Sequence, residues 1–206
     1  MAVEDEPDTV DFQCTTLHYT VAMNAFDRLV EMDNDDDGNV VLKPALAESW
    51  EISDDGMEYT FHLREGVTFS NGSPLTSSDV LYTFERLLTY PESCNQDVVS
   101  EIKGAVPLMN GETDHLEGFR IIDDLNFVVT MEKPFAAFLP CIAMPAGSIL
   151  DKETTEAAGE KFGKDPESTV GTGAFILTDW TPGKGLLLKA NPDCWDGKPG
   201  FDGLDL

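Results

Sequence analysis

The chain has 206 residues, and 41% of them are hydrophobic, so it can bury a core in one large or two small domains. It carries 39 acidic and 13 basic residues, for a formal net charge of -26. This composition excludes a disordered chain, and a surface so negative repels nucleic-acid phosphates and anionic lipid headgroups, so neither nucleic acid nor a membrane surface is an expected partner.

The first elements expected are a helix and a pair of strands. Apolar residues recur at helical spacing from Tyr19 to Met32, with Thr20 as the N-cap residue. The acidic run from Asp33 to Asn39 predicts a turn that ends this helix. Strict alternation of apolar and polar residues from Met57 to Arg64 predicts a β-strand. The preceding stretch 49–53 and an Asp-Asp-Gly turn complete a hairpin.

Helices and strands alternate irregularly through the rest of the chain. Thr76 and Asp79 form a capping-box pattern, which predicts a helix from there to about Thr89. The absence of a regular strand–helix–strand rhythm predicts a mixed α and β fold. The remaining expected elements are a hairpin of 119–123 and 127–132, short helices at 136–142 and 152–160, and strands at 174–180 and 185–190 joined by the turn 181–184.

The two ends of the sequence suggest a longer chain. Ala2-Val3 resembles the end of a strand, and 201–206 resembles the start of another. Acidic residues follow directly after Met1-Ala2, so no signal peptide is present, although we expect a secreted chain to be made with one. No apolar run is long enough to cross a bilayer, since the richest, 135–150, contains two prolines.

The four cysteines, Cys14, Cys94, Cys141 and Cys194, are spaced widely and irregularly. Without a C-x-x-C pair, a zinc site is not expected. One or two disulfides could form in an oxidising compartment, and their pairing does not follow from the sequence. Cys141 lies in an apolar stretch and is expected to be a buried free thiol.

No pattern of a catalytic or metal site is present. The three histidines are not spaced as a two-histidine metal helix, and the sequence contains no nucleophile elbow and no phosphate-binding loop. The run 33–38 copies the first half of an EF-hand calcium loop, but Pro44 stands at position twelve, where a glutamate is needed. A solvated turn is therefore favoured over a calcium site, and we expect no enzyme activity, cofactor or metal.

Two groups of residues could contact a ligand. The polar stretch from Gln13 to Leu17 could present hydroxyl and main-chain groups, or it could be an ordinary loop before a capped helix. Trp50, Trp180 and Trp195 each lie at a strand end or turn, where packing is favoured over ligand stacking.

Several segments of the chain resemble one protein family in the family's own order. The stretch 46–69, LAESWEISDDGMEYTFHLREGVTF, continues through 71–80 and 84–86, and further matches lie at 26–30, 171–175 and 191–195. Together they resemble the family 5 solute-binding proteins, which are oligopeptide-, dipeptide- and nickel-binding receptors of ABC importers. The sequence departs from the family pattern at Phe12 and Ala174, where proline is usual, and at Cys194, where tyrosine is usual.

The resemblance implies part of a two-lobed, periplasmic-binding-protein type II fold from a chain more than twice this long. It implies that residues 1–44 and 167–206 belong to the amino-terminal lobe and that 45–166 form an inserted, smaller α/β domain. The second lobe, and the segment that completes the first, would lie outside this sequence.

The resemblance also implies a function. A monomer outside the cytoplasm, periplasmic or extracellular and anchored to the cell surface as a lipoprotein, would capture di- or oligopeptides between its lobes for an ABC permease. A nickel chelate, an opine or a sugar is an alternative ligand. Less favoured alternatives are an acidic surface that binds a protein partner and a hydrolase that uses scattered carboxylates. The residues implied to flank the cleft are Cys14, Thr16, Leu17, His18, Tyr19, Thr172 and Gly173.

Overall fold

The structure is a computed structural model that describes residues 7–181 and 184–206. The strand end expected at Ala2-Val3 and the centre of the turn expected at 181–184 lie outside these residues. The helices are α1 (Thr20–Ala25), α2 (Ser77–Thr89), α3 (Ala105–Met109), α4 (Phe138–Ile142) and α5 (Lys152–Ala158), with short 3-10 turns η1 (Gln96–Val98), η2 (Pro145–Gly147), η3 (Gly159–Lys161) and η4 (Pro166–Ser168). The strands are β1 (Val30–Asn34), β2 (Val40–Pro44), β3 (Ala47–Ile52), β4 (Glu58–Leu63), β5 (Phe119–Ile121), β6 (Asn126–Thr130), β7 (Phe175–Thr181), β8 (Gly185–Ala190) and β9 (Gly203–Asp205).

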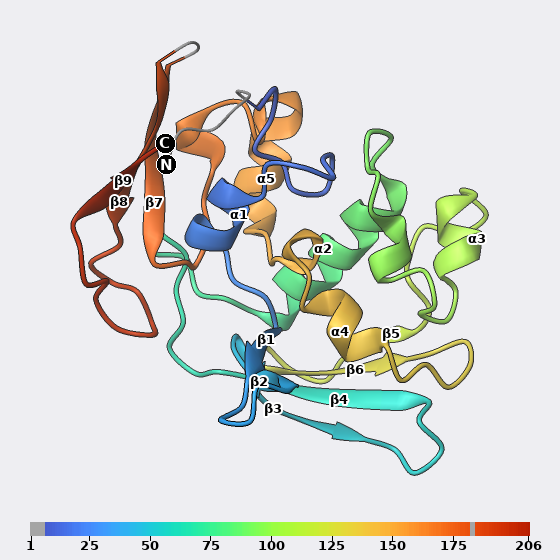
Figure 1. Cartoon of the computed structure of the whole chain (residues 1–206). Coiled ribbons are helices and arrows are strands. Elements are labelled where there is room, and N and C mark those ends of the chain that lie inside the picture. The colour runs from blue at the N-terminus through green and yellow to red at the C-terminus, as the bar shows by residue number, and fades with distance from the viewer. Residues whose placement is uncertain (1–6, 182–183) are drawn as a thin grey trace.

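A four-stranded antiparallel sheet in the order β3-β4-β6-β5 forms the base of the molecule in Figure 1, and α2 and α4 cover one face of it. The alternation predicted for β4 is confirmed, because Tyr59, Phe61 and Leu63 are buried while the residues between them are not. On the covered face Phe127 stacks between two other rings, with centroids 5.1 Å from Phe61 and 4.9 Å from Phe119. Sheet and helices therefore share one aromatic interior.

The second sheet, in the order β7-β8-β9, stands beside α1 at the left of Figure 1. Its buried side chains include Phe175, Leu177 and Leu188, and they pack with Phe12 and Phe26 from the amino-terminal segment. We call this cluster the smaller core. The larger core is the cluster around the four-stranded sheet. The strands predicted at 174–180 and 185–190 are confirmed.

The two cores bear on the predicted division into domains. That division, at 44/45 and 166/167, stays a prediction. The cores favour earlier edges, near residues 29 and 150, because Leu29 and Val30 pack in the larger core while Leu150 and Phe162 pack in the smaller one. The chain thus crosses between the cores at 26–29 and at 149–150, and it returns to the larger core at Val170.

The helix predicted from Tyr19 to Met32 is wrong in length. It is the six-residue α1, and its N-cap is Tyr19, with no side-chain capping bond, rather than Thr20. Phe26 is already extended, and Val30 then pairs with Pro44 in the β1–β2 hairpin. Packing in the larger core overrides the helical spacing, since Leu29 and Val30 are fully buried there.

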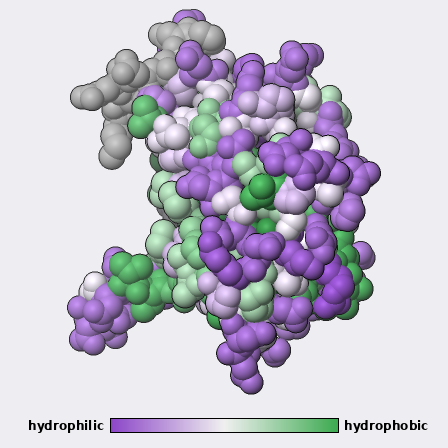
Figure 2. Space-filling view, turned by 90° about the vertical axis from the view of Figure 1, so that its right-hand side faces the viewer, coloured by the Kyte–Doolittle hydropathy of each residue, from purple (hydrophilic) through white to green (hydrophobic). Residues whose placement is uncertain are grey.

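The β1–β2 hairpin projects from the body with one apolar and one charged face. Val30, Met32, Leu42 and Val40 share a face by the strand register, and Met32 and Val40 are exposed. In Figure 2 the hairpin projects at the lower left, with hydrophobic atoms along it and hydrophilic atoms at its tip. The predicted acidic turn forms this tip.

The carboxylate of Asp35 holds the hairpin tip together. It accepts hydrogen bonds from the main-chain nitrogens of Asp37 (3.0 Å) and Asn39 (2.8 Å) and from the Asn39 side chain. The Asp35 carboxylate therefore stabilises the turn by hydrogen bonding to the turn's own residues.

Other local predictions are confirmed. The capping box forms, with the main-chain nitrogen and hydroxyl of Thr76 donating to Asp79 at 2.9 and 2.8 Å, and α2 ends at Thr89. Asp79 also accepts from the main-chain nitrogen of Lys152 at 3.1 Å, which ties the start of α5 to the start of α2. The hairpin β5–β6 and the helices α4 and α5 lie where they were expected.

The Phe127 stack predicts a large stability difference between two phenylalanine substitutions. Phe127→Ala should lower the free energy of unfolding by about 3–5 kcal/mol, because it opens a cavity between two buried rings. Phe201→Ala, at an exposed ring, should cost less than about 1 kcal/mol. Urea denaturation measures both, and equal losses would contradict the assignment of the larger core.

Candidate ligand-binding site

The loop 14–19, between the amino-terminal segment and α1, is held from outside by Asn95. The Asn95 side-chain amide donates to the carbonyl oxygens of Phe12 and Gln13, each at 3.2 Å, and of Thr15 at 2.8 Å. The main-chain nitrogen of Cys94 donates to the same Gln13 oxygen at 3.0 Å. The segment just before η1 therefore fixes the start of this loop.

Within the loop, side chains close a compact turn. The Tyr19 hydroxyl donates to the Thr15 carbonyl at 2.7 Å, and the Thr15 hydroxyl donates to the Leu17 carbonyl at 2.6 Å. Thr16 and His18 form no hydrogen bond with any residue in the described ranges, and Leu17 is 66% exposed. The main-chain groups of Thr16 and His18 are thus available to an outside partner.

His18 has an unusual backbone conformation. Its φ is 61°, which makes it the single non-glycine residue with positive φ among those that the structure describes. A side chain disfavours this left-handed region, so the surrounding bonds must hold the residue there. Such strain is common where a loop is shaped for binding.

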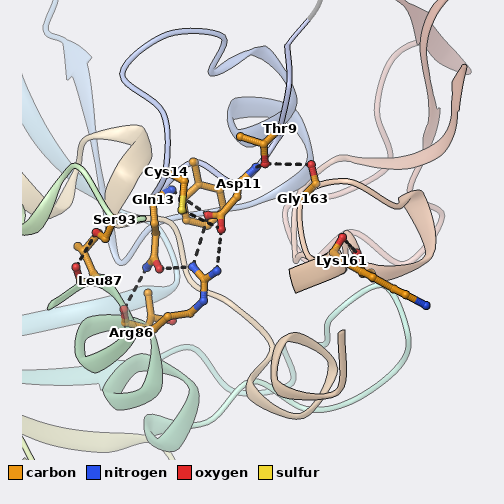
Figure 3. A network of polar contacts seen from close by, with 12 residues as sticks. Thr9, Asp11, Gln13, Cys14, Arg86, Leu87, Ser93, Lys161 and Gly163 are labelled. Atoms are coloured by element: carbon orange, nitrogen blue, oxygen red, sulfur yellow. Dashed lines mark hydrogen bonds and ion pairs between the residues drawn. The ribbon is translucent and has the colours of Figure 1, made fainter. Parts of the chain in front are cut away.

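Figure 3 shows the buried polar network beneath the loop. The Arg86 guanidinium on α2 donates to Asp11 from Nη2 at 2.6 Å and to the side-chain oxygen of Gln13 from Nη1. Gln13 in turn donates to the carbonyl of Thr83 at 3.0 Å, and Asp11 accepts from the Gln13 main-chain nitrogen at 3.0 Å. The network joins α2, which packs in the larger core, to the segment that leads into the loop.

Ring faces and burial complete the surroundings of Arg86. Its guanidinium carbon lies 4.3 Å from the ring centroid of Tyr90 and 5.1 Å from that of Phe162. Asp11, Gln13 and Arg86 are all buried. A charge in this position is stable only because its partner and the hydrogen bonds around it are complete.

The thiol of Cys14 belongs to the same network. It donates to Asp11 at 3.3 Å (Figure 3). Burial, and next the negative charge of Asp11, raise the pKa of Cys14 to about 12. The thiol therefore stays protonated at neutral pH, when it acts as a hydrogen-bond donor rather than as a nucleophile.

Thr172 and Gly173 lie away from this loop, at the other end of α1. The Gly173 nitrogen donates to the carbonyl of Ala25 at 3.0 Å, and a Cβ on Gly173 would lie 2.6 Å from the carbonyl carbon of Ala25. Thr172 is fully buried, and its hydroxyl donates to Asp27 at 2.9 Å. In this structure neither residue reaches the surface that the loop presents, so their predicted ligand contact stays a prediction.

Asp27 is the centre of this second region. Its carboxylate also accepts from the Trp195 indole nitrogen at 2.8 Å, and its carbonyl accepts from the nitrogen of Ile149 at 2.9 Å. The Arg64 guanidinium lies over the Trp195 ring, 4.8 Å from its centroid. An open hollow of about 410 Å³ adjoins these residues. Trp195 lines this hollow and is partly buried against the larger core, so the packing role favoured by the sequence stays a prediction.

The structure brings five of the seven predicted residues together, from Cys14 to Tyr19, and separates the other two by the length of α1. It adds Asp11, Arg86 and Asn95. The sequence did not indicate these residues, because the contacts Asp11–Arg86, Gln13–Thr83 and Asn95–Thr15 each join residues at least 70 positions apart.

No cluster of metal-ligating side chains occurs in 7–181 or 184–206, and no helix in these ranges is long and apolar enough to span a membrane. All four cysteines are free thiols, and Cys141 is half-buried.

Comparison with known families decides what this architecture is. The sequence profile of the bacterial extracellular solute-binding proteins, family 5 (middle), matches residues 41–206. The chain belongs to this family. The family is one of solute-binding proteins rather than enzymes, and its members are periplasmic or extracellular.

Two relatives illustrate the range of this solute-binding family. The di/tripeptide-binding protein 2 of Pseudomonas aeruginosa is 34% identical over 180 residues, covering 82% of this chain and 33% of that protein. The heme-binding protein A of Haemophilus influenzae is 33% identical over 201 residues, covering 92% of this chain and 35% of that protein. The chain spans about a third of the length of these relatives.

A solved structure confirms the fold. The substrate-binding domain of an oligopeptide ABC transporter from Bacillus anthracis superposes with a TM-score of 0.81 at 31% identity, covering 91% of this chain and 36% of that one. The mixed α and β fold and the family expected from the sequence are therefore both confirmed for this part of a solute-binding protein.

The buried ion pair predicts a strong effect of a single substitution. Asp11→Ala should lower the free energy of unfolding by about 3–5 kcal/mol, because it leaves the Arg86 charge buried without its partner. Lys103→Ala, in the exposed Lys103–Glu117 pair of the same 2.6 Å length, is the matched control and should leave the urea midpoint nearly unchanged. Similar midpoints for the two variants would contradict the role given to the network.

The raised pKa of Cys14 predicts slow chemistry at its thiol. In a variant with Cys94, Cys141 and Cys194 changed to serine, alkylation by iodoacetamide at pH 8 should be about 50- to 1,000-fold slower than for free cysteine. The rate should rise with pH towards about 12, because the thiolate forms only there. Mass spectrometry follows the reaction, and a rate like that of the same variant in urea would refute the assignment.

Proposed function

We propose that this chain contributes one wall of a cleft that captures peptides for an ABC importer. The observation that carries the proposal is the loop 14–19, which leaves the main-chain groups of Thr16 and His18 unpaired at the surface. An extended peptide offers matching main-chain donors and acceptors, and such pairing tolerates many ligand side chains. Membership of a family with di/tripeptide- and oligopeptide-binding members supports this choice of ligand.

Family membership alone leaves the ligand open, since one relative is named for heme. The exposed apolar side chains near the loop suit a peptide. Leu17 is 66% exposed and Met23, on α1, is 60% exposed. Flexible apolar side chains of this kind adapt to ligand groups of different shape. Leu17 and Met23 would then contact peptide side chains, while Thr16 and His18 bind the main chain.

The proposal assigns further roles to the predicted site residues. Cys14 and Tyr19 hold the loop in shape from within, through Asp11 and Thr15. Thr172 and Gly173 support the far end of α1. The chain would act as a monomer outside the cytoplasm, anchored at the cell surface, with a membrane permease as partner and without catalytic activity.

One wall of a cleft cannot exclude water from both sides of a peptide, so affinity should depend on a second wall. We expect the 206-residue chain alone to bind di- and tripeptides with a dissociation constant of about 1 mM or weaker. Isothermal titration calorimetry with a peptide library tests this, and micromolar binding by the chain alone would show that no second wall is needed.

A pair of substitutions at Thr16 separates main-chain from side-chain recognition. The test uses a protein that contains both walls of the cleft. In it, Thr16→Pro removes a main-chain donor and should weaken peptide binding about tenfold, whereas Thr16→Ala keeps that donor and should change affinity less than twofold. Unchanged melting temperatures confirm that both variants fold. Equal affinities for the two variants, or heme bound more tightly than any peptide, would overturn the proposal.

A further inference from the structure

Cys14 and Cys94 are 80 positions apart in sequence, yet their main chains adjoin. The main-chain nitrogen of Cys94 donates to the carbonyl oxygen of Gln13 at 3.0 Å, and its sulfur lies 3.7 Å from the same oxygen. That oxygen belongs to the peptide group that joins Gln13 to Cys14. Among the described residues, no main-chain hydrogen bond of Cys141 or Cys194 leads to the neighbourhood of another cysteine.

Covalent geometry bounds the distance between the two cysteines. Across a trans peptide, the carbonyl oxygen lies about 2.8 Å from the next Cα, and a Cα lies about 1.5 Å from its own nitrogen. With the 3.0 Å hydrogen bond between them, the Cα atoms of Cys14 and Cys94 can be no more than about 7.3 Å apart. Disulfides join Cα atoms up to about 6.8 Å apart, so rotation of the side chains and a small main-chain shift would suffice.

We propose that Cys14 and Cys94 form a disulfide under oxidising conditions, which fastens the loop 14–19 to the segment before η1. The biological setting rests on the proposed location outside the cytoplasm, where disulfides persist. The bond would replace the hydrogen bond from the Cys14 thiol to Asp11 with a covalent link, beside the hydrogen bonds by which Asn95 already holds the loop. It would close a long stretch of chain, the case in which a disulfide restricts the unfolded state most.

The reaction needs an oxidant, for which a low-molecular-weight disulfide suffices. The Cys94 thiol is the exposed one, so it loses its proton to solvent, attacks the reagent and releases one thiol. Cys14 then loses its proton, attacks the Cys94 sulfur of the mixed disulfide and releases the second thiol. Two protein thiols are oxidised, one reagent disulfide is reduced to two thiols, and no other reactant is consumed.

The environment of Cys14 sets the rate of this reaction. Its thiol donates to Asp11, and its thiolate is scarce at neutral pH. The second step is intramolecular, however, and the proximity of the two residues compensates for a low thiolate fraction. Oxidation of the folded chain should therefore speed up as the pH rises above 8.

Peptide mapping tests the proposal on the 206-residue chain. We expect incubation with oxidised glutathione at pH 8.5, followed by acid quench and non-reducing digestion, to yield one linked pair of peptides containing Cys14 and Cys94. The oxidised chain should melt roughly 10 °C above the reduced chain. Cys94→Ser should lose both the linked pair and the shift, while Cys194→Ser, the matched control, should keep both.

Three results would overturn the proposal. They are stable glutathione adducts on Cys14 and Cys94 separately, a link that involves Cys141 or Cys194, and the same melting shift in the Cys94→Ser chain. The measurement involves no ligand, so a missing disulfide leaves the peptide-binding proposal standing, and a failure to bind peptides leaves the disulfide standing.

Discussion

The ion pair between Arg86 and Asp11 is the contact on which the candidate site depends. It joins a helix that packs on the larger core to the segment that feeds the loop 14–19, and both charges are buried. Their desolvation is offset only while Asp11 also accepts from the Gln13 nitrogen and Gln13 accepts from Arg86. A complete network of this kind permits essentially one relative placement of helix and segment.

That single placement explains the shape of the loop above it. Once Gln13 is fixed, its carbonyl oxygen accepts hydrogen bonds from the Cys94 nitrogen and the Asn95 side chain. The Asn95 side chain also donates to the Thr15 carbonyl and so positions Thr15. The strained backbone of His18 follows from a short loop whose two ends are both held. A loop that is ordered before a ligand arrives loses less conformational entropy on binding, which favours affinity.

Local patterns in the sequence were enough to predict most strands and the longest helix. The alternation in β4 and the capping box at Thr76 each involve neighbours a few residues apart, and both appear in the structure. The helix prediction past Ala25 failed because Leu29 and Val30 pack in a different core from α1, and nothing in their spacing reveals that.

The candidate site could be predicted only in part, for a related reason. The sequence identified the loop 14–19 through its polar residues and the family resemblance, but it could not select Asp11 as the partner of Arg86 among 39 acidic residues. The role of the residues at 172–173 was ambiguous, because a small residue is needed both where two backbones approach closely and where a ligand contacts the backbone. The structure shows the close approach, against Ala25.

The crossings between the two cores have a mechanical consequence. The chain passes between the cores at 26–29 and 149–150, and these passages are bonded to each other through Asp27 and Ile149. Alone they would act as a pivot, about which one half could swing. The Arg86–Asp11 ion pair lies apart from these crossings and restrains such a rotation, as does the hydrogen bond from the Lys152 nitrogen to Asp79. The two halves are therefore joined at several separate points, which opposes rotation of one half about the other.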